Sequence, residues 1–105
     1  MTNKEKIVLD KFKSLLLERI PVCHMVLFGS RARGNADEYS DMDVIVVTDN
    51  LNKETEDYIS DCAWEAGIDA GIVVCPISYS GDEWESRLIQ RSKFVESVIE
   101  DGIYL

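Results

Sequence analysis

The run Val44-Ile45-Val46-Val47 constrains the fold of this chain more than any other stretch. Four consecutive β-branched residues favour a strand, and the absence of a polar residue at every second position indicates burial on both faces. A strand of this kind needs a packed layer on each side of its sheet. The run therefore predicts a buried strand over residues 41–48 in a layered fold.

The rest of the chain supplies elements that suit such layers. Apolar residues at helical spacing follow the possible capping box of Thr2 and Glu5, and Pro21 ends this first helix or follows its end. Strands are expected over residues 22–28 and 68–77. A second helix reaches about residue 66 before Gly67, a short helix opens at Ser80 and Glu83, and a last helix covers about residues 92–100.

The order of these elements predicts an α/β (α+β) fold. The strand over 41–48 is linked through a helix to the strand over 68–77, and such a crossover favours two parallel, adjacent strands. We expect a small sandwich in which helices flank a mixed sheet of three or more strands. With 105 residues, the chain is expected to form one domain over residues 1–105.

The overall charge narrows the classes of function. The formal net charge is −9, whereas a nonspecific nucleic-acid-binding protein needs a basic face. No direct nucleic-acid or membrane partner is expected, and the N-terminus lacks the apolar core of a signal peptide, which indicates a cytoplasmic protein. Cys23, Cys62 and Cys75 are widely spaced in apolar surroundings, so we expect buried free thiols rather than a zinc site.

Two carboxylates stand at the start of the central strand. Side chains alternate across a strand, so Asp41 and Asp43 are expected on the same face, where each raises the free-energy cost of ionising the other. A bound divalent cation removes that cost, and Mg²⁺ is typically held by one or two carboxylates together with substrate phosphates. Asp41 and Asp43 are therefore the predicted metal ligands.

A turn able to hold phosphate precedes this pair in the sequence. Gly29 follows a strand and allows the backbone N–H groups to approach an anion closely, while the Ser30 hydroxyl can donate a hydrogen bond to it. If residues 30–34 begin a short helix, its N-terminal amides extend the same cradle. Arg31 and Arg33 are candidates for offsetting phosphate charge.

Taken together, Gly29-Ser30, ten further residues and Asp41-Met42-Asp43 resemble the signature of the polymerase-β-like nucleotidyltransferase superfamily. The surrounding Leu-Phe-Gly-Ser-Arg-Ala-Arg-Gly and Ser-Asp-Met-Asp-Val resemble its minimal nucleotidyltransferase branch. The resemblance implies ATP, Mg²⁺ and transfer of a nucleoside monophosphate to a hydroxyl. Many minimal members are antitoxins that add AMP to a helical HEPN-type toxin, which implies such a protein as partner.

The family usually has a third carboxylate on the next strand, and here Ile72-Val73-Val74 contains none. Asp69 is the nearest candidate, with a solvated residue at the start of the strand as the alternative. A subunit that blocks a helical partner by binding alone therefore remains the second hypothesis. Antibiotic nucleotidylation usually needs a further domain for the acceptor, and a plain α/β domain with a chance motif is the remaining alternative.

Overall fold

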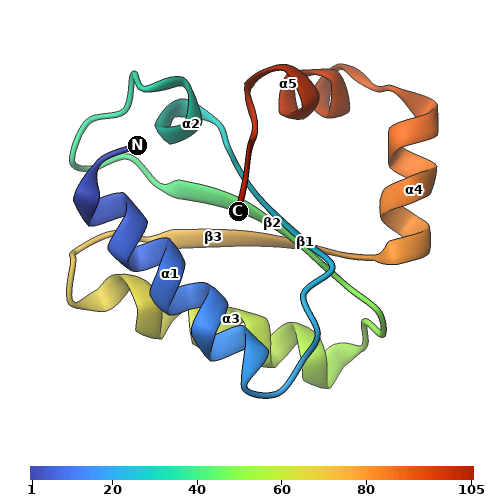
Figure 1. The fold of residues 1–105 in the computed structure, drawn as a ribbon, viewed down its shortest axis with the longest axis horizontal. Helices are drawn as coiled ribbons and strands as arrows, with labels where there is room; N and C mark the ends of the chain where they lie inside the picture. The colour runs from blue at the N-terminus through green and yellow to red at the C-terminus, as the bar shows by residue number, and fades with distance from the viewer.

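The computed structural model describes residues 1–105 and contains five helices and four strands (Figure 1). The helices are α1 (Asn3–Leu17), α2 (Ser30–Arg33), α3 (Lys53–Ile68), α4 (Gly81–Gln90) and α5 (Lys93–Asp101), and the strands are β1 (His24–Phe28), β2 (Met42–Thr48), β3 (Val74–Ser80) and β4 (Ile103–Tyr104). None of the helices is both long enough and apolar enough to cross a membrane.

The four strands form one mixed sheet in the order β3-β2-β1-β4. β2 runs parallel to β3, with Met42 opposite Val74, and antiparallel to β1, with Asp43 opposite Phe28. The parallel pairing across the α3 crossover confirms the predicted adjacency of the second and third strands. The predicted mixed sheet with flanking helices is likewise confirmed.

Alternate residues of β2 pack into two separate clusters on the two faces of the sheet. Val44 and Val46 lie in the larger cluster, which α1 and α3 cover, while Ile45 and Val47 pack with Trp84 of α4 and Val98 of α5 on the opposite face. Figure 1 shows α1 and α3 together on one side of the strands, with α4 and α5 beyond the other side. This two-sided burial confirms the interpretation of the central run.

The covering of the second face is incomplete, and this leaves room for a site. Ile45 and Val47 are fully buried by α4 and α5, whereas Asp43, on the same face two residues earlier, is only partly buried. Phe28 of β1 lies beside it and packs edge-on against Phe94 of α5, with ring centroids 5.4 Å apart. The first residues of β2 therefore lie at the open end of this face.

The predicted boundary at Gly67 is wrong, because α3 runs on to Ile68. Gly67 has another purpose: a Cβ on it would lie 2.0 Å from the carbonyl oxygen of Ile72. The chain folds back tightly here, and the Gly67 carbonyl accepts N–H groups from Ala70 and Ile72. The tight return delays the strand, so β3 begins at Val74 rather than at residue 68.

Smaller differences concern side chains and the C-terminus. Of the three cysteines, only Cys62 is buried; Cys23 is exposed and Cys75 is partly exposed. No sequence pattern predicts β4, which is only two residues long and pairs with β1. The capping boxes of Thr2 and Ser80 are both present as predicted.

Candidate active site

The Gly29 turn and the carboxylate of Asp43 are in close contact. Gly29 follows β1 with φ 76° and ψ −156°, a conformation that essentially only glycine adopts. A Cβ at this position would lie 2.7 Å from Oδ2 of Asp43. Glycine is therefore required both by the backbone geometry and by the carboxylate that lies against it.

Asp41 and Asp43 form a pair of acids with no cation between them in the protein. Asp41 is exposed at the start of the strand, and Asp43 makes none of the chain's three ion pairs. Burial, and then the negative charge of Asp41, raises the pKa of Asp43 above its ordinary value. Burial and the neighbouring acid thus both disfavour the charged form of Asp43, and a bound divalent cation would offset both effects.

Cys75 is the side chain that the third strand brings to this pair. It lies opposite Asp43 in the β2–β3 register, so its side chain is on the same face of the sheet. Burial, and then the charges of Asp41 and Asp43, raise the pKa of the Cys75 thiol. The place of Cys75 beside the pair does not follow from the sequence, because the predicted strand begins six residues before β3 and gives a different register.

Asp69 does not lie on β3, where the sequence analysis placed it. It is the C-terminal cap of α3, and its 88% exposed side chain makes a 3.6 Å ion pair with Lys11 of α1. Since α1 and α3 cover the opposite face of the sheet from Asp43, the structure does not bring Asp69 to the pair. No three histidine, cysteine or acidic side chains in the chain are placed to hold a metal ion together. The arrangement is therefore a two-carboxylate half-site.

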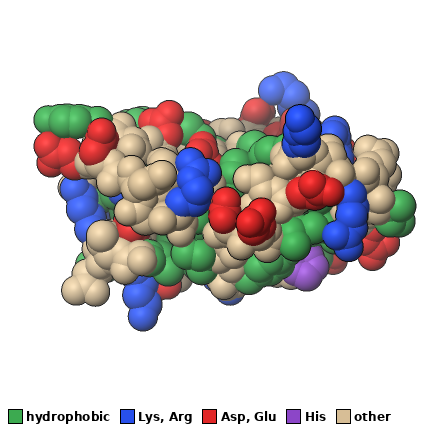
Figure 2. Space-filling model, turned by 90° about the horizontal axis from the view of Figure 1, so that it is seen from above, with side chains coloured by type: hydrophobic (Ala, Val, Ile, Leu, Met, Phe, Trp, Pro, Cys, Tyr) green, Lys and Arg blue, Asp and Glu red, His purple; other side chains and the backbone are tan.

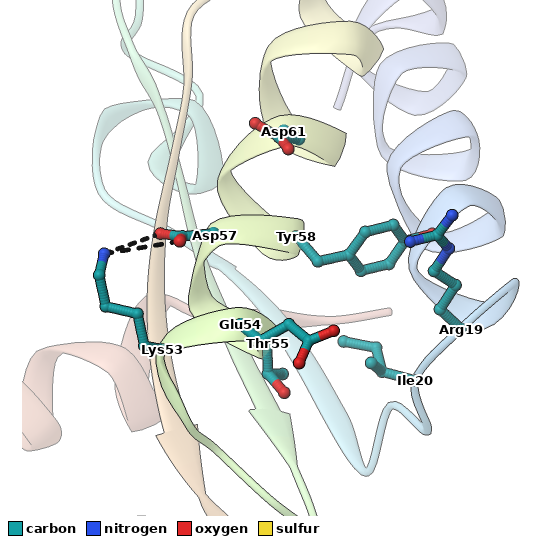
Figure 3. Close-up of a pocket in the computed structure, with 8 residues that line it drawn as sticks. All are labelled: Arg19, Ile20, Lys53, Glu54, Thr55, Asp57, Tyr58 and Asp61. Carbon is teal, nitrogen blue, oxygen red and sulfur yellow. Dashed lines mark hydrogen bonds and ion pairs between the residues drawn. The ribbon is translucent and has the colours of Figure 1, made fainter.

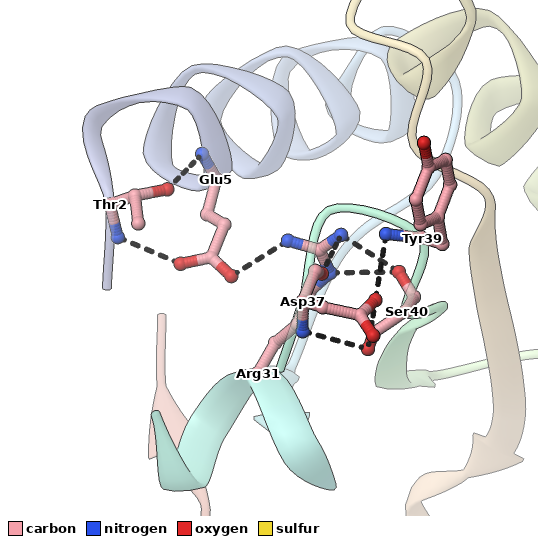
Figure 4. Close-up of polar contacts among 6 residues, drawn as sticks. All are labelled: Thr2, Glu5, Arg31, Asp37, Tyr39 and Ser40. Atoms are coloured by element: carbon pink, nitrogen blue, oxygen red, sulfur yellow. Dashed lines mark hydrogen bonds and ion pairs between the residues drawn. The ribbon is translucent and has the colours of Figure 1, made fainter. Parts of the chain in front are cut away.

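The remaining motif residues separate into two groups. Ser30 begins α2, whose first backbone N–H groups have no partner within the helix, and Arg33 is exposed at its end. Arg31, in contrast, is buried and directs its guanidinium toward Glu5 and the carbonyl of Ser40 (Figure 4). Ser30 and Arg33 remain candidates for phosphate contacts, whereas the N–H groups of Arg31 already have partners within the protein.

The largest hollow of the surface lies away from these residues. It is an open depression between the end of α1 and the start of α3, where Arg19 stacks over the ring of Tyr58 and Lys53 pairs with Asp57 (Figure 3). None of the motif residues lines it. Size alone is therefore a poor guide here, because the candidate chemistry is on the other face of the sheet.

A second, more apolar groove lies at the β3 edge of the sheet. It runs between α3 and the free edge of β3, and its lining includes Trp64, Ile68, Val73, Cys75 and Pro76. The Trp64 side chain is 68% exposed, so it lies outside the core and is accessible to a partner. Cys75 connects this groove with Asp41. We call these lining residues the β3 groove.

The surface seen from the side of α2 and α5 is mixed in character. Figure 2 shows acidic and basic side chains interspersed with exposed apolar ones across this view. Such a surface lacks the uniform sign of charge that steers a polyanion to a protein. It is compatible with a substrate held by a few specific contacts.

Comparison with known proteins agrees with this geometry. The nucleotidyltransferase domain family matches residues 9–105, and no curated protein sequence matches the chain. A crystal structure of a toxin–antitoxin with AMP-PNP shares the fold with a TM-score of 0.61 at 20% identity, over 98% of this chain and 72% of that chain. A mutant of the toxin–antitoxin MntA-HpeT gives 0.58 at 22% identity, over 100% and 72%.

A further structure, of the tri-AMPylated Shewanella oneidensis HEPN toxin in complex with MNT antitoxin, has a TM-score of 0.54 at 18% identity, over 96% of this chain and 70% of that chain. Likenesses at this level of identity establish the fold, and the fold is the one that the Gly-Ser and Asp-x-Asp motif predicts. The expected nucleotidyltransferase fold is thus confirmed. From the match over residues 9–105 we conclude that the chain belongs to the nucleotidyltransferase domain family.

Proposed function

We propose that this protein is a Mg²⁺-dependent nucleotidyltransferase that moves AMP from ATP to a hydroxyl group of a partner protein. The single observation that carries the proposal is the packing of the Asp43 carboxylate against the Gly29 turn, with Asp41 beside it. This contact puts a pair of predicted metal ligands directly beside a turn suited to phosphate. A triphosphate with its cation needs both at once.

The motif residues other than Arg31 then have roles in binding. Asp41 and Asp43 would hold the cation, which supplies charge neutralisation to the triphosphate when bound. Ser30 and the first amides of α2 would position the phosphates, and Arg33 would offset their charge. Catalysis by this chain is then largely orientation and charge stabilisation.

The reaction balances without any further reagent. The acceptor oxygen forms a bond to the α-phosphorus, and the bond from that phosphorus to the bridging oxygen breaks. Pyrophosphate leaves, and the proton of the acceptor hydroxyl passes to solvent. No third carboxylate is held beside Asp41 and Asp43 to take that proton, so a slow chemical step is expected.

Two observations support a protein as the acceptor. The β3 groove is apolar, reaches Cys75 beside the acidic pair, and exposes Trp64, which is typical of the aromatic anchors of protein interfaces. In addition, similar folds occur in structures described as toxin–antitoxin and as an AMPylated HEPN toxin with MNT antitoxin. A helical HEPN-type protein is therefore the proposed partner, with its modified hydroxyl delivered along the β3 groove.

The same acidic pair motivates the second candidate function. The side chain that β3 places beside the pair is Cys75 and not a third carboxylate, and a neutral thiol with a raised pKa is a poor base. A subunit that binds the HEPN-type partner without transferring AMP is consistent with this site.

A label-transfer experiment separates the two candidates. The protein and its Asp43→Asn variant are incubated with a HEPN-type partner, Mg²⁺ and ATP labelled at the α-phosphate, with γ-labelled ATP as the control for phosphorylation. We expect label from the α-phosphate only, a mass increase of one AMP per modified hydroxyl, and no transfer by Asp43→Asn. A stable complex without label would establish the non-catalytic function instead.

A further inference from the structure

Arg31 is a buried cation in the middle of the motif. Its side chain is 7% exposed, and its guanidinium donates to oxygen atoms of the protein on two sides. Figure 4 shows it between the start of α1 and the loop that leads to β2. Burying a charged group is costly unless the group is paired and hydrogen-bonded, and the guanidinium of Arg31 meets both conditions.

On one side, Arg31 holds the loop immediately before Asp41. Its Nε and Nη2 groups both donate to the carbonyl oxygen of Ser40, at 3.0 and 2.8 Å, and Nη2 also reaches the carbonyl of Asp37 at 3.4 Å. Asp37 in turn closes the loop, since its carboxylate accepts the N–H of Tyr39 at 2.8 Å. The guanidinium thus fixes the peptide that precedes Asp41.

The residue after Asp41 is fixed as well. The N–H of Met42 donates to the carbonyl of Val73 at 2.9 Å, which starts the β2–β3 pairing. Asp41 therefore lies between two anchored peptides, one held by Arg31 and one held by the sheet. Because Asp41 itself is exposed, these anchors are what fixes its backbone.

On the other side, Arg31 is held by Glu5 of α1. The ion pair is 2.9 Å long, and both side chains are less than 10% exposed, at 7% and 6%. The second carboxylate oxygen of Glu5 accepts the N–H of Thr2 at 2.7 Å in the capping box. Glu5 lies before residue 9, where the match to the nucleotidyltransferase domain family begins.

We propose that Arg31 and Glu5 are positioning residues for the metal ligand Asp41: Glu5 orients the guanidinium, and the guanidinium sets the Ser40 peptide from which Asp41 projects. Arg31 then acts through Asp41 and not through contact with the triphosphate. This inference rests on the proposed function, because it assigns Asp41 to the metal. Partners one step removed from a metal ligand commonly alter metal affinity by about 10–100-fold when they are replaced.

The test measures metal and nucleotide binding, not turnover. Mn²⁺ is the probe, since it prefers oxygen ligands as Mg²⁺ does and is paramagnetic, so its binding with ATP is followed by magnetic resonance. Arg31→Lys keeps the positive charge but cannot span the Ser40 carbonyl with two donors. Arg19→Lys is the matched control, because the Arg19 guanidinium lies over the ring of Tyr58 and makes no hydrogen bond to the loop that Arg31 holds.

We expect Arg31→Lys to weaken Mn²⁺–ATP binding by about tenfold at a temperature where it is fully folded, and Arg19→Lys to leave it unchanged. In an Asp41→Asn background, Arg31→Lys should cause little further loss, because its effect passes through Asp41. Unchanged affinity in Arg31→Lys would overturn the proposal. A full additional loss in the Asp41→Asn background would also overturn it, since it would mean direct contact with the nucleotide.

Two further measurements keep the proposal decidable. If Arg31→Lys does not fold, Glu5→Gln takes its place, with a several-fold weaker Mn²⁺–ATP affinity expected and an unchanged affinity as the contradicting result. If the wild type does not bind Mn²⁺–ATP, the proposed function fails, and amide hydrogen exchange decides the positioning. Faster amide exchange at residues 39–42 in Arg31→Lys than in the wild type, with unchanged exchange in β1, supports the positioning role of Arg31. Exchange at residues 39–42 that equals that of the wild type overturns it.

Discussion

The chain holds two acidic sites on either side of one loop, and only one of them has a cationic partner within the protein. Glu5 has Arg31 opposite it and a hydrogen bond on each carboxylate oxygen. Asp43 has another acid, Asp41, as the nearest charge, and it takes part in no ion pair. The negative charge of Glu5 is neutralised by Arg31 within the fold, whereas no cation within the fold neutralises the charge of Asp43.

The pKa values follow this contrast. Burial raises the pKa of Glu5, but hydrogen bonds from Thr2 and Arg31 and the charge of Arg31 outweigh it, so the net pKa is lowered. Burial and Asp41 act together to raise the pKa of Asp43. Since a shifted pKa is also a contribution to stability, Glu5 stabilises the folded state at neutral pH whereas Asp43 destabilises it. The destabilised site is where function is expected.

The largest effect should come from breaking the compensated site. Replacing Arg31 with Met leaves the Glu5 carboxylate buried without its partner, and such losses cost about 3–5 kcal/mol. We expect Arg31→Met to lower the free energy of unfolding by that order, measured by urea denaturation at low temperature. The double variant Glu5→Gln/Arg31→Met should lose clearly less than the sum of the two single variants. Additive losses would show that the ion pair is not the source of the stability.

The uncompensated site should respond in the opposite direction. Asp43→Asn removes the repulsion with Asp41, so we expect the protein without ligands to gain stability, on the order of 0.5–1 kcal/mol at pH 7. Asp10→Asn, a change of the same kind on the exposed face of α1, is the control and should change little. A loss of stability in Asp43→Asn would mean that the carboxylate is held by the fold after all.

The pH dependence sharpens the same contrast. Because the folded-state pKa of Asp43 is raised, its unfavourable contribution is absent below its unfolded pKa and develops as pH rises through the folded value. The stability advantage of Asp43→Asn should therefore be smaller near about pH 4 than at pH 7, given an ordinary Asp pKa of about 3.9. Glu5, with a lowered pKa, should lose its stabilising contribution as pH falls through its folded pKa. Thermal unfolding of wild type and variant across this range measures the difference.

The smallest effect on stability is expected at the β3 groove. Trp64 and Ile89 are 68% and 82% exposed, so replacing either with Ser should change the free energy of unfolding by no more than about 0.5 kcal/mol. Only Trp64→Ser should reduce AMP transfer to the partner, because Ile89 lies on α4, outside the groove. Equal AMP transfer by both variants would show that the β3 groove does not bind the partner.

The fold could be predicted from the sequence where the signal is local. The double-sided run of β2 and the capping boxes of Thr2 and Ser80 are patterns within a few residues, and the parallel pairing of β2 with β3 follows from the order of strand, helix and strand along the chain. The end of α3 could not be predicted in this way, because Gly67 allows a close approach to the Ile72 carbonyl and does not end the helix. β4 depends on pairing with β1, and two residues carry too little pattern to show it.

The candidate site was predictable in part for the same reason. The spacing of the motif predicted that Gly29 and Asp43 serve one site, but their direct contact is known only from the structure. The place of Cys75 depends on the register between two strands, which the sequence does not specify once the strand start is misplaced. The burial of Arg31 depends on Glu5, 26 residues away in the chain. Sequence patterns do not show such contacts between distant segments of the chain.

The most direct test of the central claim is a thermal-shift titration of the wild type and Asp43→Asn with ATP, with and without Mg²⁺. A ligand that binds only the folded protein stabilises it by about 2.7 kcal/mol at a hundredfold excess over its dissociation constant. We predict a large Mg²⁺-dependent increase in melting temperature for the wild type. Asp43→Asn should start from a higher melting temperature and gain little. The absence of any shift in the wild type at millimolar ATP and Mg²⁺ would contradict the claim that Asp41 and Asp43 form a metal–nucleotide site.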